Sequence, residues 1–326
     1  MKVKEFIKRE YKFIIFLIVI LIVFYIKLPY YISAPGGIID ITDRVQMEGY
    51  ENKNGSLNML YVSEYETTPA SYVWAKLFGY EISPIEDRQI SNESSGDIEA
   101  RNKIMRDNSL DIATMVAYTK AGRDISIKDK RNVVIATTID NGLNVGDVIL
   151  EVDGIECEDV QQIKDIIKTK EVGNTVTFNI LRDKKEKEVQ SEVMLEDNSK
   201  VIGVIIITEY DYELNPEVNI KFKNSESGSS GGLMLTLTIY NAISDDDIIK
   251  GRNIAGTGTI LSDGSVGEID GVKYKIMGAA KNNMDIVLVP GGNYEEAIET
   301  KEKYNYNLEI VKIDTFDDAI EYLLNN

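Results

Sequence analysis

Apolar and polar residues alternate along most of this chain, but one unbroken apolar run extends from Phe13 to Ile26. From residue 198 onward, stretches with strand-type spacing alternate with longer stretches of helical spacing. The expected strands span 201–208, 217–223, 253–260 and 285–289, and the expected helices span 231–243, 272–281, 293–302 and 315–324. This order predicts an α/β arrangement.

The part of the chain before residue 198 shows two further patterns. Strands are expected over 38–41 and 58–63 with a turn at 52–55, then helices over 68–83 and 97–121 separated by a polar loop over 85–97. Residues 130–197 change to short strands, 132–136, 175–181 and 188–194, around one helix at 158–168. This change predicts a small β-rich domain.

The apolar run from Phe13 to Ile26 is a candidate membrane-spanning segment. Its fourteen residues are short for a span of about 20, but Lys27 can reach the interface and the apolar character continues to Ile32. Residues 1–12 are rich in Lys and Arg, which favours the cytoplasmic side. We expect a basic cytoplasmic tail over 1–12, a single transmembrane helix over 13–32 and residues 33–326 outside the cell. A cleaved signal peptide is the alternative, but no small-x-small site follows the run.

Composition excludes several classes of function. The 54 acidic and 36 basic residues give a net charge of −18, which argues against nucleic acid as a partner. The chain contains no histidine, so a Ser-His-Asp triad and a His-ligated zinc site are excluded within it. No Gly-x-x-x-x-Gly-Lys-Ser/Thr sequence is present, so we expect no ATP-binding module, no cofactor and no metal. The single cysteine, Cys157, is expected to be a small, half-buried residue.

A stretch of serine and glycine, Ser225 to Gly232, precedes the helically spaced run Leu233 to Ile243. Glycine allows a tight turn and a close approach of other atoms. A helix that begins there directs free N–H groups toward Ser230, where they could stabilise an oxyanion. The alternative is a flexible loop with an ordinary helix cap.

A second stretch, Gly267 to Lys275, changes the interpretation of the first. Together they resemble the proteolytic domain of Lon-type serine proteases, which carries its nucleophile in Gly-Pro-Ser-Ala-Gly. The general base of that family is the second Lys of a Gly-Gly-Leu-Lys-Glu-Lys-like segment. The resemblance implies that Ser230 is the nucleophile and Lys275 the base, with Gly228, Ser229 and Gly231 in support.

Between these stretches, Ala255 to Ile260 resembles the Thr-Gly-Glu-Ile segment of the same family. The resemblance implies that the hydroxyl of Thr257 orients the lysine. The chain departs from the family at Ser229, Gly231 and Thr259, which replace Pro, Ala and Glu. None of these departures removes a reacting group.

A lysine can act as a base only when its amine is neutral. Burial lowers the pKa of a lysine, and the N-terminal end of a helix also favours the neutral amine. Lys275 is expected near the start of an apolar-spaced helix, so both effects apply to it. Lys273 is two residues away and should face another side of the helix.

The segment Gly142 to Gly154 resembles the Gly-Leu-x-x-Gly-Asp-x-Ile-x-x-Val-Asp-Gly signature of bacterial-type PDZ domains. These domains add an extended peptide to a sheet edge. The resemblance implies a peptide site at Arg131, Asn132 and Val133, with a groove between the strand from Val134 and the helix from Glu158. The Gly-Leu-Gly-Phe loop of the family is not present as such.

The two resemblances predict an α/β (α+β) Lon-type proteolytic domain split by an inserted PDZ domain. Its N-terminal part would span 33–125, the PDZ domain 127–197 and the catalytic part 198–326, with Met105 and Ser109 as candidates for matching positions. The implied protein is a membrane-tethered, ATP-independent serine endopeptidase with a Ser-Lys dyad. Its partners would be peptide or protein substrates, the cytoplasmic membrane and, as an open alternative, further copies of itself. A non-catalytic peptide-binding scaffold is the second hypothesis.

Overall fold

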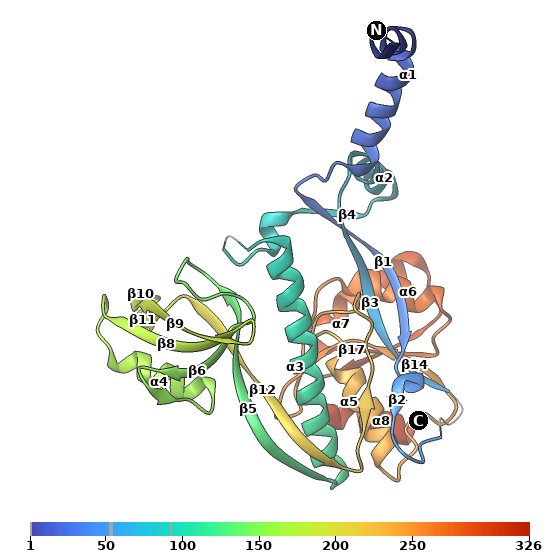
Figure 1. Cartoon of the computed structure of the whole chain (residues 1–326). Coiled ribbons are helices and arrows are strands. Elements are labelled where there is room, and N and C mark those ends of the chain that lie inside the picture. Colours follow the sequence, from blue (N-terminus) through green and yellow to red (C-terminus); the bar gives the residue numbers. More distant parts are fainter. Residues whose placement is uncertain (1, 52–54, 92) are drawn as a thin grey trace.

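The computed structural model describes residues 2–51, 55–91 and 93–326, so residues 52–54 of the expected turn lie outside the described residues. The larger lobe is built on one sheet, shown in Figure 1. Its strand order is β18 (Glu309–Ile313), β17 (Ile286–Pro290), β14 (Asn253–Gly256), β3 (Ser56–Glu66), β1 (Tyr30–Asp40) and β4 (Glu81–Pro84). Strands from before residue 85 and from after residue 252 thus share one sheet.

Helices cover both faces of this sheet. Every residue of β17 is buried; Ile286 and Leu288 belong to one apolar cluster, and Val287 and Val289 belong to another. This period of two is what a strand covered on both faces produces. The first cluster includes α3 (Ser95–Ala121), α5 (Gly232–Ile243) and α8 (Phe316–Asn325). The second includes α6 (Val272–Lys281) and α7 (Tyr294–Tyr304). The four helices expected after residue 198 are confirmed to within two residues.

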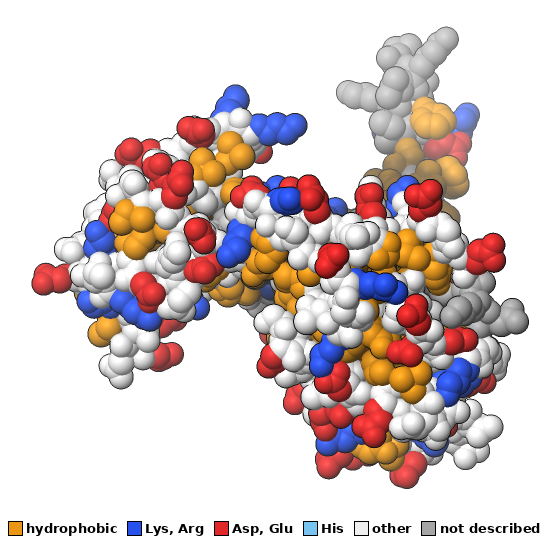
Figure 2. Space-filling view, turned by 90° about the horizontal axis from the view of Figure 1, so that it is seen from below, with side chains coloured by type: hydrophobic (Ala, Val, Ile, Leu, Met, Phe, Trp, Pro, Cys, Tyr) orange, Lys and Arg blue, Asp and Glu red, His pale blue; other side chains and the backbone are white. Residues whose placement is uncertain are grey.

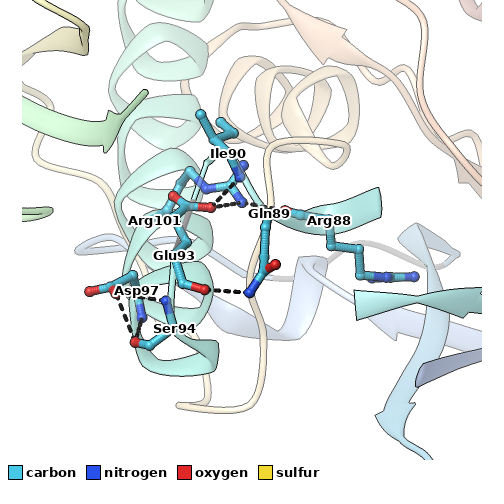
Figure 3. Close-up of polar contacts among 7 residues, drawn as sticks. All are labelled: Arg88, Gln89, Ile90, Glu93, Ser94, Asp97 and Arg101. Atoms are coloured by element: carbon cyan, nitrogen blue, oxygen red, sulfur yellow. Dashed lines mark hydrogen bonds and ion pairs between the residues drawn. The ribbon is translucent and has the colours of Figure 1, made fainter. Parts of the chain in front are cut away.

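Helix α3 is fixed at both ends by its own sequence. Ser94 caps its first turn through a capping box with Asp97, and Gly122 ends it with a left-handed φ of 63°. Before the cap, the carboxylate of Glu93 forms an ion pair with Arg101 at 2.8 Å, which Figure 3 shows together with the neighbouring polar contacts. The polar loop before α3 is therefore held against the helix.

The smaller lobe contains a sheet with the order β12 (Val204–Asn215), β5 (Asp124–Thr137), β6 (Val148–Val152), β8 (Thr175–Arg182) and β9 (Lys185–Glu192). Helix α4 (Val160–Thr169) packs on this sheet, with Ile163 and Ile167 in a core shared with Phe178 and Ile180. The strands β5 and β12 pair along their whole lengths and form a ribbon that joins the lobes (Figure 1). The predicted end of the PDZ domain at residue 197 lies before β12.

Short elements complete the described chain. They are η1 (Thr42–Arg44), β2 (Val45–Gln46), α2 (Pro69–Phe78), η2 (Ile85–Arg88), β7 (Ile155–Glu156), β10 (Met194–Glu196), β11 (Ser199–Val201), β13 (Asn219–Ile220), β15 (Thr259–Ile260), β16 (Val266–Gly267) and η3 (Gly291–Asn293). Figure 2 shows Asp and Glu side chains spread over both lobes, with apolar side chains in separate patches on each lobe and between the lobes.

Several expected elements have different bounds. The strand expected over 201–208 is β12, which begins at Val204 and continues to Asn215, and the strand expected over 217–223 is reduced to β13. The first strand was expected from Ile38, but β1 begins at Tyr30 and continues through a register shift between Pro35 and Ile38. Gly36 permits this path because a Cβ there would lie 2.1 Å from the carbonyl oxygen of Tyr61. The helix expected over 68–83 ends at Phe78, because Gly79 takes a left-handed φ and the chain then forms β4.

The expected membrane anchor over 13–32 is corrected. Helix α1 (Lys2–Tyr25) ends before Lys27, and residues 30–32 already belong to β1. Within residues 2–51, 55–91 and 93–326, no helix combines the length and apolar character that a membrane crossing needs. The reason in α1 is that charged residues, among them Lys8, Arg9 and Lys12, occupy its first half.

Candidate active site

The serine-rich loop before α5 is held by α3. The backbone N–H of Gly228 donates to the carbonyl oxygen of Asn102 at 2.9 Å, and the hydroxyl of Ser109 donates to the carbonyl oxygen of Ser229 at 3.2 Å. Gly228 has a φ of 89°, a conformation that a residue with a side chain adopts only under strain. Residues predicted as support at 228 and 229 are thus positioned by a helix more than a hundred positions earlier.

A half-buried ion pair fixes the start of the same loop. Arg44 donates two hydrogen bonds to the carboxylate of Glu226, at 2.5 and 2.9 Å, and Arg106 donates to the Glu226 carbonyl oxygen at 2.7 Å. Burial is the largest single influence on Glu226 and would raise its pKa, but the hydrogen bonds and positive charges of Arg44 and Lys223 together outweigh burial, so the pKa is lowered. This two-point contact, which sequence reasoning did not find, ties the loop to η1.

Close packing explains why position 231 is a glycine. A Cβ on Gly231 would lie 1.8 Å from the sulfur of Met59, which belongs to β3. A Cβ on the next residue, Gly232, would lie 2.9 Å from the hydroxyl oxygen of Ser109. The Lon pattern has alanine at this position. Here Met59 packs against the loop and leaves no room for the alanine side chain.

Lys275 lies in the second turn of α6 and is 3% exposed. Its Nζ donates to Oγ1 of the fully buried Thr257 at 2.9 Å. That hydroxyl donates in turn to the carbonyl oxygen of Ser230 at 3.0 Å, and the N–H of Gly258 donates to the same oxygen at 2.8 Å. A chain of hydrogen bonds thus connects the three residues predicted to act together.

Burial changes the proton affinity of Lys275. It lowers the pKa of the amine to about 8, although the nearby carboxylates of Asp270 and Glu64 act in the opposite direction. An appreciable fraction of the amine is therefore neutral near pH 8. Lys273 takes another side of the helix, where its Nζ lies 5.1 Å from the ring centre of Tyr274.

A cleft of about 840 Å³ opens beside Ser230. The cleft is lined by part of the loop between Phe222 and Gly231 and by the stretch of β3 from Met59 to Glu64. Strand β14 pairs with β3 only as far as Met59. In the described chain, the edge of β3 beyond Met59 has no strand on that side, and this stretch lines the cleft. The cleft thus combines a serine with an unpaired strand edge.

A second, apolar groove lies in the small lobe between α4 and β12. Its volume is about 310 Å³ and its lining includes Ile163 and Ile167 of α4 and Ile205 and Ile206 of β12. Within the described residues, β12 pairs only with β5, so its other edge is unpaired. A strand edge beside a helix is the geometry in which an extended peptide can add to a sheet.

The predicted peptide site at Arg131, Asn132, Val133 and Val134 is therefore corrected. These residues lie on β5, which has β12 on one side and β6 on the other, so this stretch offers no free edge. Asn132 is buried and serves the fold, since its side chain donates to the carbonyl oxygen of Cys157 at 2.7 Å. One sequence feature could have pointed to the groove beside β12. It is Gly203, a glycine directly before the strongly apolar start of that strand.

Comparison with known proteins matches a part of each lobe to a known family. Residues 220–326 match the family model of the Lon protease (S16) C-terminal proteolytic domain, and residues 131–193 match that of the PDZ domain. The Lon protease of Campylobacter jejuni is 33% identical over 100 residues, which cover 30% of this chain and 12% of that protein. The Lon protease of Campylobacter concisus is 25% identical over 198 residues, covering 56% of this chain and 24% of that protein.

The chain thus spans from about a tenth to a quarter of the length of these curated relatives. Among solved structures, the PDZ domain of an SdrC-like protein from Listeria monocytogenes shows 24% identity and a TM-score of 0.24, covering 25% of this chain and 92% of that one. The family matches assign residues 220–326 to a Lon-type C-terminal proteolytic domain and residues 131–193 to a PDZ domain.

Proposed function

We propose that this protein is an ATP-independent serine endopeptidase in which Ser230 is the nucleophile and Lys275 the general base. The observation that carries the proposal is the buried amine of Lys275, whose pKa is lowered to about 8 and whose hydrogen bond to Thr257 leads to Ser230. A neutral amine in this position provides the base that a chain without histidine needs. ATP independence is proposed for residues 1–326 alone, in which no Gly-x-x-x-x-Gly-Lys-Ser/Thr sequence occurs.

In the proposed reaction, the neutral Lys275 accepts the proton of the Ser230 hydroxyl while the oxygen attacks the substrate carbonyl carbon. Backbone N–H groups at the start of α5 stabilise the resulting oxyanion. The lysine ammonium then gives its proton to the leaving amine as the peptide bond breaks. Water, deprotonated by the same amine, hydrolyses the acyl-enzyme and restores the serine.

We infer that the substrate is a peptide or an extended protein segment. The unpaired edge of β3 beside the cleft supports this inference, because an extended chain there can pair with β3 as an added strand. The groove between α4 and β12 supports a second contact, in which the PDZ domain selects substrates through apolar side chains. The PDZ domain would then raise the local concentration of a segment near the cleft.

The cellular location is a separate proposal. Helix α1 exposes large apolar side chains, among them Phe13, Phe16 and Phe24, which supports contact with the cytoplasmic membrane. The basic residues near its start support contact with the anionic headgroups of that membrane. The protein should therefore be recovered with the membrane fraction of lysed cells. Recovery in the soluble fraction at physiological salt would contradict this location.

The proteolytic proposal is tested with the full chain and a mixture of unstructured polypeptides, with products identified by mass spectrometry. Wild type should produce new peptide ends, and Ser230→Ala should produce none. Ser262→Ala removes an exposed serine of the turn between β15 and β16 and serves as the matched control, with wild-type products expected. Identical product patterns for wild type and Ser230→Ala would favour the second hypothesis, a non-catalytic peptide-binding scaffold.

A further inference from the structure

Helix α2 presents its large apolar side chains to solvent. Val73, Trp74, Leu77 and Phe78 are 59%, 43%, 78% and 60% exposed, whereas Ala75 is fully buried. Positions i, i+1, i+4 and i+5 share one face of a helix, so these four side chains form a single stripe. We call it the α2 stripe. A helix that buries its alanine and exposes its largest side chains has an apolar face that its own fold does not cover.

The α2 stripe is held in a defined shape. Helix α2 starts in a capping box at Thr68 and ends at Gly79, which has a left-handed φ of 67°. The ring of Trp74 lies 4.9 Å from the ring of Phe78 and 5.0 Å from that of Tyr80. Because the aromatic surface is pre-organised, little conformational entropy is lost when it docks.

The surroundings of the α2 stripe indicate what it contacts. Helix α2 contains Lys76 and no acidic residue, although the chain as a whole has a net charge of −18. Helix α1 contacts α2 and exposes further large apolar side chains at the same end of the molecule (Figure 1). An apolar face with tryptophan, bordered by lysine, is typical of helices that lie in a membrane interface.

We propose that α2 docks flat on a lipid bilayer, with the α2 stripe inserted between headgroups and acyl chains and Lys76 at the level of the phosphates. A second copy of the chain fits less well, since four such side chains offer roughly 400–500 Å² against the ~800 Å² per partner of a standard interface. The proposal goes beyond proteolysis. It depends on the location proposed above in one respect only, namely that the bilayer is the cytoplasmic membrane.

Trp74 provides a direct test because it is the single tryptophan of the chain, so its fluorescence reports on α2 alone. The full chain is mixed with vesicles of phosphatidylcholine and phosphatidylglycerol in equal parts. A second set of vesicles carries bromine on the acyl chains of the phosphatidylcholine. Binding should shift the emission of Trp74 to shorter wavelength, and the brominated lipid should quench it.

Two variants sharpen the test. Leu77→Ser combined with Phe78→Ser should weaken insertion about tenfold or more, which removes most of the quenching. Leu195→Ser, at a leucine of the small lobe that is 60% exposed, is the matched control and should leave the quenching unchanged. Equal melting temperatures of the variants and wild type show that a loss of quenching is a loss of docking, not of folding.

Three results would overturn the proposal. The first is a vesicle-bound protein whose Trp74 emission is neither shifted nor quenched, which leaves attachment through α1 and the protease function untouched. The second is no binding to vesicles, which also contradicts the membrane location. The third is a wavelength shift that grows with protein concentration without lipid, because a second copy would then cover the α2 stripe.

Discussion

Lys275 donates a hydrogen bond from Nζ to Oγ1 of Thr257 at 2.9 Å, and both side chains are shielded from solvent. The hydroxyl of Thr257 donates its one hydrogen bond to the carbonyl oxygen of Ser230, so toward the amine of Lys275 it can act only as an acceptor. A neutral amine that donates one hydrogen here keeps its lone pair for another group. The pair therefore orients the lysine without blocking its use as a base.

The pH dependence of cleavage should follow Lys275. Because burial lowers the pKa of its amine to about 8 and the neutral form is the active one, the rate should rise with pH through about 8 and then level off. Lys275→Arg should be inactive, since a guanidinium does not release its proton in this range. Lys273→Ala is the control and should keep the wild-type pH profile. An active Lys275→Arg enzyme would refute the Ser-Lys mechanism.

The Thr257 hydroxyl should matter for both stability and activity. Thr257→Val keeps the shape but leaves the amine of Lys275 without this partner in a buried site, which should cost about 1–3 kcal/mol of unfolding free energy. The rate should fall because the amine is no longer oriented. Thr257→Ser restores the hydroxyl and should recover most of the rate. Chemical denaturation and initial-rate measurements check both effects, and equal rates for the Val and Ser variants would contradict the orienting role.

Gly231→Ala should harm this protein although it introduces the alanine of the Lon pattern. The new Cβ would meet the sulfur of Met59 at 1.8 Å, so the loop or the methionine must shift, at a cost of about 1–3 kcal/mol. Adding Met59→Ala should relieve the clash, so the two substitutions together should be less destabilising than the sum of their separate effects. Strict additivity in denaturation experiments would show that the two residues do not compete for space.

Peptide binding by the small lobe should depend on β12 and not on β5. Ile205→Asp places a charge in the apolar groove and should weaken the binding of a peptide with an apolar end about tenfold or more. Arg131→Ala alters an exposed residue of β5 and should leave the affinity unchanged. Fluorescence anisotropy with a labelled peptide measures both affinities. The reverse ranking of the two variants would restore the site predicted on β5.

Asp111 should make stability depend on pH where α3 meets the ribbon. Its carboxylate accepts hydrogen bonds from the N–H of Tyr210 and the hydroxyl of Tyr212, and burial raises its pKa from 3.8 to about 6. A carboxyl with a raised pKa stabilises the folded state below pH 3.8, and this contribution is lost as the pH rises to about 6.

The difference in melting temperature between wild type and Asp111→Asn should therefore change between pH 4 and 6 in favour of the variant. Asp211→Asn alters an exposed carboxylate of the neighbouring strand β12 and serves as the control. A constant difference between wild type and Asp111→Asn across this range would show that Asp111 has an ordinary pKa.

The C-terminal helices could be predicted from the sequence because each carries its own apolar period and end signals. Helix α6 matches its expected bounds, and Lys275 falls on its buried side as the position near Gly271 suggested. The contact between Thr257 and Lys275 followed from a resemblance, and its catalytic meaning stays a prediction. Its geometry could not be derived from spacing, because only the folded chain brings Thr257, directly after β14, next to Lys275 of α6.

Other features depend on contacts distant in sequence. The Arg44–Glu226 ion pair joins residues 182 positions apart, and no local pattern marks either partner. The peptide groove was assigned to the wrong strand because the order of β12 and β5 in the sheet is a tertiary property. The predicted anchor over 13–32 was wrong because β1 begins at Tyr30, within a stretch where an apolar strand and an apolar helix look alike.

Strand β3 joins the cleft beside Ser230 to α2, with only Thr67 and Thr68 between the strand and the helix. A strand rises about 3.3 Å per residue, so Ser63 in the cleft and Pro69 at the start of α2 are separated by about 20 Å of chain at most. A twisted strand fixed in a sheet bends little. If α2 rests on a bilayer, β3 therefore fixes the distance between the cleft and the bilayer surface. In a polypeptide tethered to that bilayer, the peptide bonds that reach the cleft would then be selected by their distance from the bilayer as well as by their side chains.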